Sequence, residues 1–434
     1  MNRRKLAFGI FLTILSTATA SWSQANPVIA IKAGSLFDSN SATLLTNQVV
    51  LIEGDRITDV GPADRIKIPD GAQVLDFSKA TVLPGLIDVH THMFPTRIDG
   101  KEADFLHSTF TYRMAIAVAD AERTLRAGFT AARDAGSHGT GEADVDLRDA
   151  INHGVIPGPR MQVCTMPVQT TGEGHLGTWQ AEIPDEYSTA DSPWEARKAV
   201  RKQIMWGADW IKVHADLDYR PDPDGTPFNM PSFTLEELRA LVDEAHRRHA
   251  HVAFHIKGTT LPDVIEAAGT GDTVEHAFML TGQLASKMRE KGEYLDLTVW
   301  RYYDSPYFKF VEAKRKNDPM PESERIAKIA MASGVKIVFG TGVDSDSYGP
   351  YANGDNAKEF EYLVKYGMSS AQAIQAATKV DAEMMGWQGR VGSIEKGKYA
   401  DIIAVSGNPL SDISELERVK FVMKGGRTVR NDLR

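Results

Sequence analysis

An alternation of short apolar runs with amphipathic segments fills the middle of this chain, from Pro84 to about Thr378. The runs have the length of strands, and helical patterns such as Leu235–His249 separate most of them. That helical pattern opens with Thr234 and has Glu237 three residues on, which is a capping box. The eight expected strands are residues 86–92, 130–134, 160–165, 210–214, 251–256, 273–277, 294–299 and 336–340.

Eight such units in roughly 295 residues match the usual size of a TIM (β/α)₈ barrel, so we predict an α/β fold of that kind. An open doubly wound sheet is the alternative architecture. It would not need eight repeats, and no glycine-rich dinucleotide loop follows the first expected strand.

Both ends of the chain are rich in strands instead. Short apolar runs split by turn residues extend from Val28 to about Val82, and similar runs occur at Tyr399–Val405 and Val419–Met423. The simplest arrangement pairs the two ends. We therefore predict a small β-sandwich domain made of residues 26–83 and 380–434, packed on a barrel of residues 84–379.

The first 25 residues are typical of a cleaved export signal. A positive segment at residues 3–5 precedes an apolar run at residues 6–15, and small residues follow at Ala20 and Ala25. The apolar run is too short to span a bilayer comfortably, so cleavage is favoured over a membrane anchor. The mature protein is therefore expected to be periplasmic or secreted, with no membrane partner.

Charge and cysteine content narrow the possible functions. The formal net charge is −9, spread along the chain, which argues against a nucleic-acid binder. Cys164 is the single cysteine, so no intramolecular disulfide can form. Because Cys164 lies in an apolar run, a buried structural role is favoured over a catalytic thiol.

Histidines collect at the C-terminal ends of the expected strands, where barrel enzymes place their active sites. The first strand ends in Asp-Val-His-Thr-His, and alternate side chains share one face, so His90 and His92 can bind one metal ion together. The fifth strand ends at His255, and the sixth carries His276. One such histidine would more often be a core residue, but two on consecutive strands beside the first pair favour a metal site.

A lysine and an aspartate extend this pattern. Lys212 lies in the apolar fourth strand, where burying an ammonium group is costly. Lys212 could react with carbon dioxide to form a carbamate that bridges two cations, or it could pair as an ammonium with a barrel carboxylate. At the end of the eighth strand, Asp344 or Asp346 could add a carboxylate to the same rim.

These motifs resemble the amidohydrolase superfamily over essentially all of the mature chain. Pro84-Gly85-Leu86-Ile87-Asp88-Val89-His90-Thr91-His92 is similar to the signature of that superfamily. Residues 392–401 resemble the return of the chain into the family's β-domain. A narrower resemblance is to the imidazolonepropionase-like and zinc-prolidase-like branch, to which ochratoxin-degrading amidohydrolases belong. It rests on residues 128–130, 133–136, 156–160, 207–212, 275–276 and 354–357.

The resemblance implies two divalent metal ions, with zinc as the expected metal. His90 and His92 match the ligands of the first metal, and His255 and His276 match those of the second. Lys212 matches the lysine whose carbamate, formed from CO₂, bridges both ions.

Asp344 matches the aspartate that binds the first metal and shuttles protons. The family usually has Gly-Thr-Asp there, whereas this chain has Gly340-Thr341-Gly342-Val343-Asp344. Either two residues are inserted before the aspartate or its role has moved. We prefer Asp344 to Asp346 because it should lie on the same strand face as Gly340 and Gly342.

Residues near the rim are candidates for substrate contacts. His175, in a glycine-rich loop after the third strand, is either the donor to the oxyanion or a surface histidine. The resemblance implies, from their position in the family, that Tyr219 and Arg220 hold a substrate carboxylate, and His138 is a further rim candidate. The second choice for the carboxylate is the group Arg301, Tyr302 and Tyr303. The remaining histidines are expected to be surface or structural residues: His107, His153, His246, His249 and His251.

The resemblance thus implies a metal-dependent hydrolase that acts on carbon–nitrogen bonds of small molecules. The leading expectation is cleavage of the amide bond to a C-terminal amino acid in dipeptides or N-acyl amino acids, with ochratoxin A as an aromatic example. A cyclic amidase or lactonase of the imidazolonepropionase type is the alternative, and a non-catalytic metal-binding protein is a remoter one. Family members often form homo-oligomers, so the resemblance also allows one here.

Overall fold

The computed structural model describes residues 28–98, 101–102, 108–171, 188–216, 220–221, 227–228, 232–303, 305–314, 320–344 and 351–433. The expected export signal, residues 1–25, lies outside this range. Among the described residues, no helix is long and apolar enough to cross a membrane.

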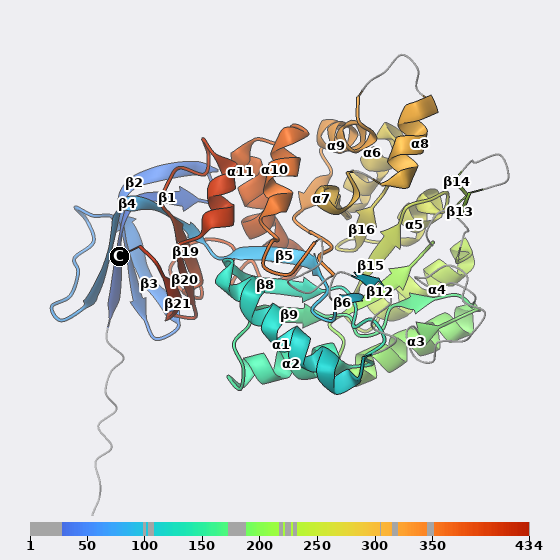
Figure 1. Ribbon diagram of the computed structural model, residues 1–434, viewed down its shortest axis with the longest axis horizontal. Helices are drawn as coiled ribbons and strands as arrows, with labels where there is room; N and C mark the ends of the chain where they lie inside the picture. Colours follow the sequence, from blue (N-terminus) through green and yellow to red (C-terminus); the bar gives the residue numbers. More distant parts are fainter. Residues whose placement is uncertain are drawn as a thin grey trace, which may run out of the picture.

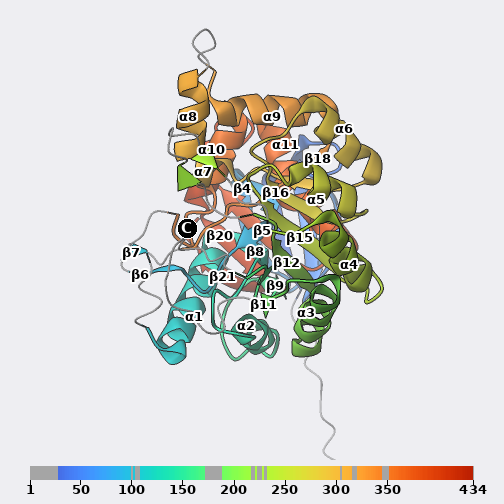
Figure 2. The same ribbon diagram turned by 90° about the vertical axis from the view of Figure 1, so that its right-hand side faces the viewer.

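Eight parallel strands form the barrel that the alternating pattern predicts (Figures 1 and 2). The amide of Asp209 donates to the Val163 carbonyl (2.8 Å), which joins the third strand to the fourth. The amide of Val89 donates to the Phe339 carbonyl (3.0 Å), which brings the last strand back to the first. The strands are β5 (Leu86–Thr91), β8 (Phe129–Asp134), β9 (Arg160–Val163), β12 (Trp210–His214), β15 (His251–Ile256), β16 (Thr273–His276), β17 (Tyr294–Asp296) and β18 (Lys336–Val338).

Helices cover the outside of the barrel (Figure 2). The capping box at Thr234 is present, since its hydroxyl accepts from the Glu237 amide and the Glu237 carboxylate accepts from the Thr234 amide (2.8 Å). That helix ends at His246, three residues earlier than predicted. The helices are α1 (Phe110–Arg126), α2 (Ala143–Asn152), α3 (Pro193–Trp206), α4 (Leu235–His246), α5 (Leu261–Ala267), α6 (Gly282–Lys291), α7 (Val299–Tyr302), α8 (Pro306–Lys314), α9 (Glu322–Ser333), α10 (Lys358–Lys365), α11 (Ser370–Gln375) and α12 (Asp381–Met384).

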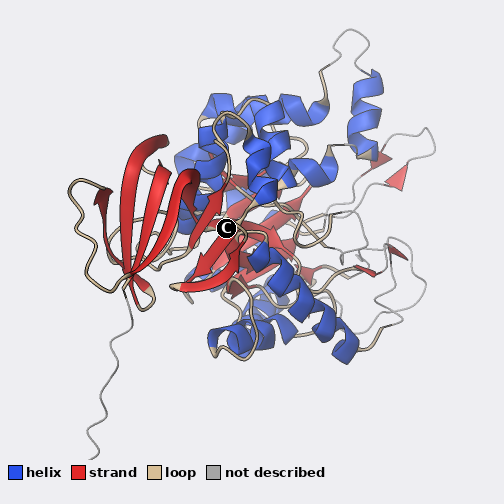
Figure 3. Cartoon of the chain, turned by 60° about the vertical axis from the view of Figure 1, so that its left-hand side comes forward, coloured by secondary structure: helices blue, strands red, loops and turns tan. Residues whose placement is uncertain are grey.

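Strands from both ends of the chain form one seven-stranded sheet beside the barrel, in the order β21-β20-β19-β4-β1-β2-β3 (Figures 1 and 3). The two ends meet where β4 pairs antiparallel with β19, Leu83 opposite Ile403. The barrel with a small β-domain from both chain ends is therefore confirmed. The strands of this sheet are β1 (Ile29–Asp38), β2 (Thr43–Glu53), β3 (Arg56–Pro62), β4 (Gln73–Pro84), β19 (Ile402–Val405), β20 (Phe421–Lys424) and β21 (Arg427–Asn431).

The joint between the β-domain and the barrel fixes the start of the histidine-bearing strand β5. Gly85 follows β4 directly, and a Cβ atom there would lie 2.1 Å from the Thr130 hydroxyl oxygen, so only glycine fits. Its amide donates to the Asp401 carbonyl (2.8 Å). The Asp401 carboxylate in turn accepts two bonds from Arg160 of the barrel (2.8 and 3.2 Å). Strand β5 therefore begins at an anchored position.

Candidate active site

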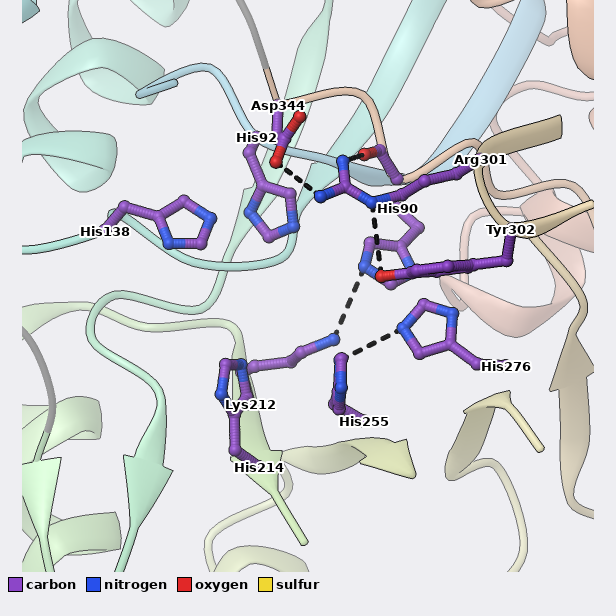
Figure 4. Close-up of a pocket in the computed structure, with 11 residues that line it drawn as sticks. His90, His92, His138, Lys212, His214, His255, His276, Arg301, Tyr302 and Asp344 are labelled. Carbon is purple, nitrogen blue, oxygen red and sulfur yellow. Dashed lines mark hydrogen bonds and ion pairs between the residues drawn. The ribbon is translucent and has the colours of Figure 1, made fainter. Parts of the chain in front are cut away.

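A small cavity opens at the C-terminal ends of the barrel strands (Figure 4). It collects every residue expected to bind metal. His90 and His92 lie at the end of β5, Lys212, His255 and His276 come from β12, β15 and β16, and Asp344 comes from the segment after β18. His138, expected at the rim, also lines it. The lining residues are His90, His92, His138, Lys212, His214, His255, His276, Arg301, Tyr302, Gly342 and Asp344.

Three of the histidine rings are oriented by a bond at Nδ1. The partners are a carboxylate oxygen of Asp296 for His90 (2.7 Å), the Gly136 carbonyl for His92 (3.2 Å) and the Thr298 hydroxyl for His276. An imidazole that donates from Nδ1 presents a free lone pair at Nε2, which is the form that binds metals. The cavity therefore holds rings turned for coordination.

Burial keeps these rings neutral. It lowers the pKa of His92 to about 3 and the pKa values of His90, His255 and His276 well below the usual histidine range. Nearby positive charges, chiefly Lys212 and Lys257, lower them further. Neutral imidazoles with free lone pairs are available at neutral pH, so no proton competes strongly with a metal ion.

Lys212 lies at the floor of the cavity with its Nζ directed toward the rings (Figure 4). It is 1% exposed, donates to a Glu275 carboxylate oxygen, and lies 3.5 Å from His90 Nε2. Burial, reinforced by the Arg133 guanidinium, lowers the pKa of Lys212 to about 7. A large share of the amine is therefore neutral at pH 7, and the neutral amine is the form that reacts with carbon dioxide.

Arg133 holds the carboxylate beneath Lys212. Its guanidinium donates to Glu275 Oε1 (2.7 Å), the Thr273 hydroxyl (3.1 Å) and the Val89 carbonyl (2.6 Å). Its Cζ also lies 4.5 Å from the centre of the Trp210 ring. Arg133 and Glu275 are both fully buried, so their charges depend on each other for compensation.

Asp344 reaches the cavity from an irregular segment that follows β18. Gly342 adopts a left-handed conformation (φ +65°), and its amide donates to the His90 carbonyl (2.7 Å). Strand β18 ends at Val338, so the expected alternation along a continuous strand is wrong, although Asp344 does line the cavity. Its carboxylate accepts from Arg301 Nη2 (2.5 Å) and the Thr96 hydroxyl (2.9 Å). Asp346 lies outside the described residues.

Two residues at the site escaped the sequence analysis. Asp296, at the end of β17, orients His90. Gly340 lies against Asp296 and must lack a side chain, because a Cβ there would lie 2.4 Å from the Asp296 carboxylate. His214 lines the cavity and packs on His255, with ring centres 4.9 Å apart. His214 lies two residues after Lys212, so strand alternation could have identified it.

Backbone strain also gathers at this end of the barrel. His276 (φ +72°), Thr298 (φ +44°) and His138 (φ +43°) adopt left-handed conformations that non-glycine residues rarely adopt. Such strain persists where the surroundings hold it, and it clusters at functional sites. At His276 the strained backbone conformation occurs in a residue whose ring lines the cavity.

Several predicted substrate residues cannot be placed. His175 and Tyr219 lie outside the described residues, and only the backbone of Arg220 is described. His107, expected to be a surface or structural residue, also lies outside them. The second choice for holding a carboxylate is better placed, since Arg301 and Tyr302 line the cavity. Tyr303 instead packs on Tyr362, with ring centres 4.8 Å apart.

The donor set fits a divalent metal of the zinc type. Imidazole nitrogens with a carboxylate oxygen are the ligands that zinc prefers outside thiolate sites. Ligand atoms of His90, Glu275 and His276 lie within 4.8 Å of one another, and His276 Nε2 is 3.1 Å from His255 Nδ1. The last contact is a hydrogen bond between two neutral rings, and both rings line the cavity in which a metal ion would be held.

Comparison with known proteins gives consistent matches over most of the chain. The amidohydrolase family model matches residues 81–429. An ochratoxinase from Aspergillus niger is 29% identical over 382 residues, 80% of this chain and 75% of that enzyme. The crystal structure of an Xaa-Pro dipeptidase with methionine bound in its active site has a TM-score of 0.78 at 31% identity, covering 93% of this chain and 100% of that one. The crystal structure of A. niger ochratoxinase has a TM-score of 0.76 at 26% identity, covering 93% of this chain and 96% of that one.

Proposed function

The chain belongs to the amidohydrolase family, and we propose that it is a binuclear metal-dependent hydrolase that cleaves the amide bond to a C-terminal amino acid. Its substrates are dipeptides and N-acyl amino acids, with ochratoxin A as an aromatic example. The carrying observation is that buried, neutral histidines, of the kind that can bind a metal ion, share one cavity with Arg301. The likeness to an ochratoxinase and to an Xaa-Pro dipeptidase supports this class of substrate.

The proposed metals are two zinc ions. His90, His92 and Asp344 would hold the first, His255 and His276 the second, and a carbamate on Lys212 would lie between them. Zinc supplies a Lewis acid and lowers the pKa of a bound water to about 7. As a proposal based on the first 25 residues, the mature enzyme acts in the periplasm or outside the cell.

The chain's own residues supply proton transfer and orientation. Asp344, held by Arg301 and Thr96, is placed to take a proton from the attacking water and to return it to the leaving amine. Asp296 keeps His90 in one tautomer by accepting from Nδ1. His138, which lines the cavity and packs on His92 with ring centres 4.3 Å apart, is the proposed donor to the oxyanion among the described residues.

Removing the metal tests the proposal directly. Treatment with a chelator is expected to abolish release of the amino acid from an N-acyl amino acid. Zinc with bicarbonate should then restore more activity than zinc in carbon-dioxide-free buffer, because the Lys212 carbamate requires CO₂. Activity that survives chelation would contradict metal dependence, and equal recovery in both buffers would contradict the carbamate.

Arg301 is expected to bind the free carboxylate of the substrate and so to make the enzyme prefer substrates that carry one. A charge-assisted hydrogen bond is worth roughly 1.5–3 kcal/mol, so Arg301→Met should raise KM for a free-acid substrate roughly 10- to 100-fold. Because Arg301 also holds Asp344, kcat should fall as well.

The comparison that isolates the carboxylate is the ratio of kcat/KM between an N-acyl amino acid and its C-terminal amide. This ratio should fall in Arg301→Met and stay constant in Arg289→Met, whose side chain is half exposed and bonds the Ser333 carbonyl. An unchanged ratio in Arg301→Met would show that another group holds the carboxylate.

A further inference from the structure

A second cluster of metal-ligating side chains lies at the opposite end of the barrel from the cavity. His246 ends helix α4, His251 begins strand β15, and Asp272 immediately precedes strand β16. His255, which lines the cavity, is four residues further along β15, or about 13 Å at about 3.3 Å per residue. The cluster is therefore separate from the candidate active site, and metal binding there would be independent of the proposed function.

The ligand atoms of these three residues lie within 4.8 Å of one another. His246 Nε2 is 2.9 and 3.0 Å from the two Asp272 carboxylate oxygens, and His251 Nδ1 is 3.7 Å from Oδ1. In a tetrahedral zinc site with bonds of about 2.0 Å, neighbouring ligand atoms are about 3.3 Å apart. The separations to Asp272 lie on either side of that value, and the two histidine ligand atoms are within 4.8 Å of each other, so side-chain rotations would accommodate an ion.

One nitrogen of the cluster has an ion-pair contact but no hydrogen bond. His251 Nδ1 is buried and makes no hydrogen bond among the described residues, since 3.7 Å is too long for one. A buried polar atom without a partner is costly unless water or an ion satisfies it. The nitrogen faces the Asp272 carboxylate, so a cation between them would satisfy both groups.

The turn beneath the cluster holds both rings in place. A Cβ atom on Gly269 would lie 2.7 Å from the His246 ring, and one on Gly271 would lie 2.5 Å from the His251 ring. The amides of Gly269 and Val252 each donate to the Asp272 carboxylate (2.8 Å). The glycines thus admit two imidazoles against the turn while backbone bonds fix the carboxylate, so little reorganisation is needed on binding.

We propose that His246, His251 and Asp272 bind one zinc ion at the N-terminal face of the barrel. Two imidazoles and one carboxylate are a common zinc donor set, and the partly exposed rings leave a fourth position for water. The ion would connect helix α4, strand β15 and the turn before β16. Residues at this face of a barrel contribute to stability, so the proposed role of the ion is to stabilise the fold.

Zinc content per chain tests the site. The mature protein is saturated with zinc, desalted and analysed by mass spectrometry of the metal, beside His251→Asn and a matched control, His249→Asn. His249 is exposed three residues beyond α4 and has a φ of +60°, which asparagine accepts. We expect His251→Asn to hold one zinc fewer per chain than the wild type and the control. Equal zinc content in all three proteins would overturn the proposal.

A second measurement uses the wild-type protein, so that the test does not depend on a variant that fails to fold. Diethyl pyrocarbonate modifies accessible imidazole nitrogens, and peptide mass spectrometry reports each histidine separately. Zinc should protect His246 and His251 from modification and leave His249 equally modified with and without the metal. Equal modification of His246 and His251 in both conditions would overturn the proposal.

Discussion

Replacing Lys212 with alanine is expected to lower kcat/KM for amide hydrolysis at least about a thousandfold, or about 4 kcal/mol of transition-state stabilisation. Lys212 is the only lysine lining the cavity described by the structure, and it lies at the floor between the histidines of β5 and those of β15 and β16. Its loss would remove the group proposed to connect both metal positions. Lys198→Ala, an exposed change on α3, is the matched control and should leave kcat/KM unchanged.

Chemical rescue of Lys212→Ala separates the two roles that Lys212 could have. If the residue acts as a carbamate, short carboxylic acids such as acetate or propionate should restore activity, because they supply two oxygens in the same place. If it acts as the ammonium that donates to Glu275, alkylamines should restore activity instead. Rescue by amines alone would contradict the carbamate, as would a variant that keeps most of the wild-type rate.

Replacing Arg133 with methionine is expected to destabilise the fold by about 3–5 kcal/mol. The change removes the bond to Glu275 Oε1 and leaves a fully buried carboxylate without its permanent cation. It also removes the bonds to Thr273 and Val89, which tie strands β8, β16 and β5 together. Urea unfolding of metal-free protein measures the loss.

A double-mutant cycle shows whether the uncompensated charge causes that loss. Glu275→Gln in the Arg133→Met background should recover part of the stability, because the neutral amide costs less to bury than the carboxylate. Additive losses from the two single changes would show that the packing of Arg133 on Trp210 matters more than its charge. A loss below about 1 kcal/mol in Arg133→Met would contradict the account of this ion pair.

The barrel and its histidines could be predicted from the sequence because the strand pattern indicates both where each strand ends and which side chains share a face. His90, His92, Lys212, His255 and His276 all lie at or near strand ends, so a strand assignment alone placed them at one rim. The structure brings them into one cavity. Their roles as metal ligands stay predictions until metal binding is measured.

The residues that support those histidines could not be predicted in the same way. Asp296 acts on His90 from another strand, across 206 positions in the sequence, and nothing near it in the chain indicates that contact. Asp344 depends on the left-handed turn at Gly342, which breaks the strand alternation used to choose it. The choice of Tyr219 and Arg220 over Arg301 rested on family position, whereas the cavity lining depends on how loops fold over the rim.

The most direct test of the central claim is a mass-spectrometric hydrolysis screen of the mature protein with zinc and bicarbonate. The panel contains dipeptides, N-acyl amino acids including ochratoxin A, and small lactams and lactones. The expected result is release of a free C-terminal amino acid from linear substrates, and chelator or Lys212→Ala should abolish it. Ring opening with every linear amide left intact would contradict the account and indicate a cyclic amidase or lactonase.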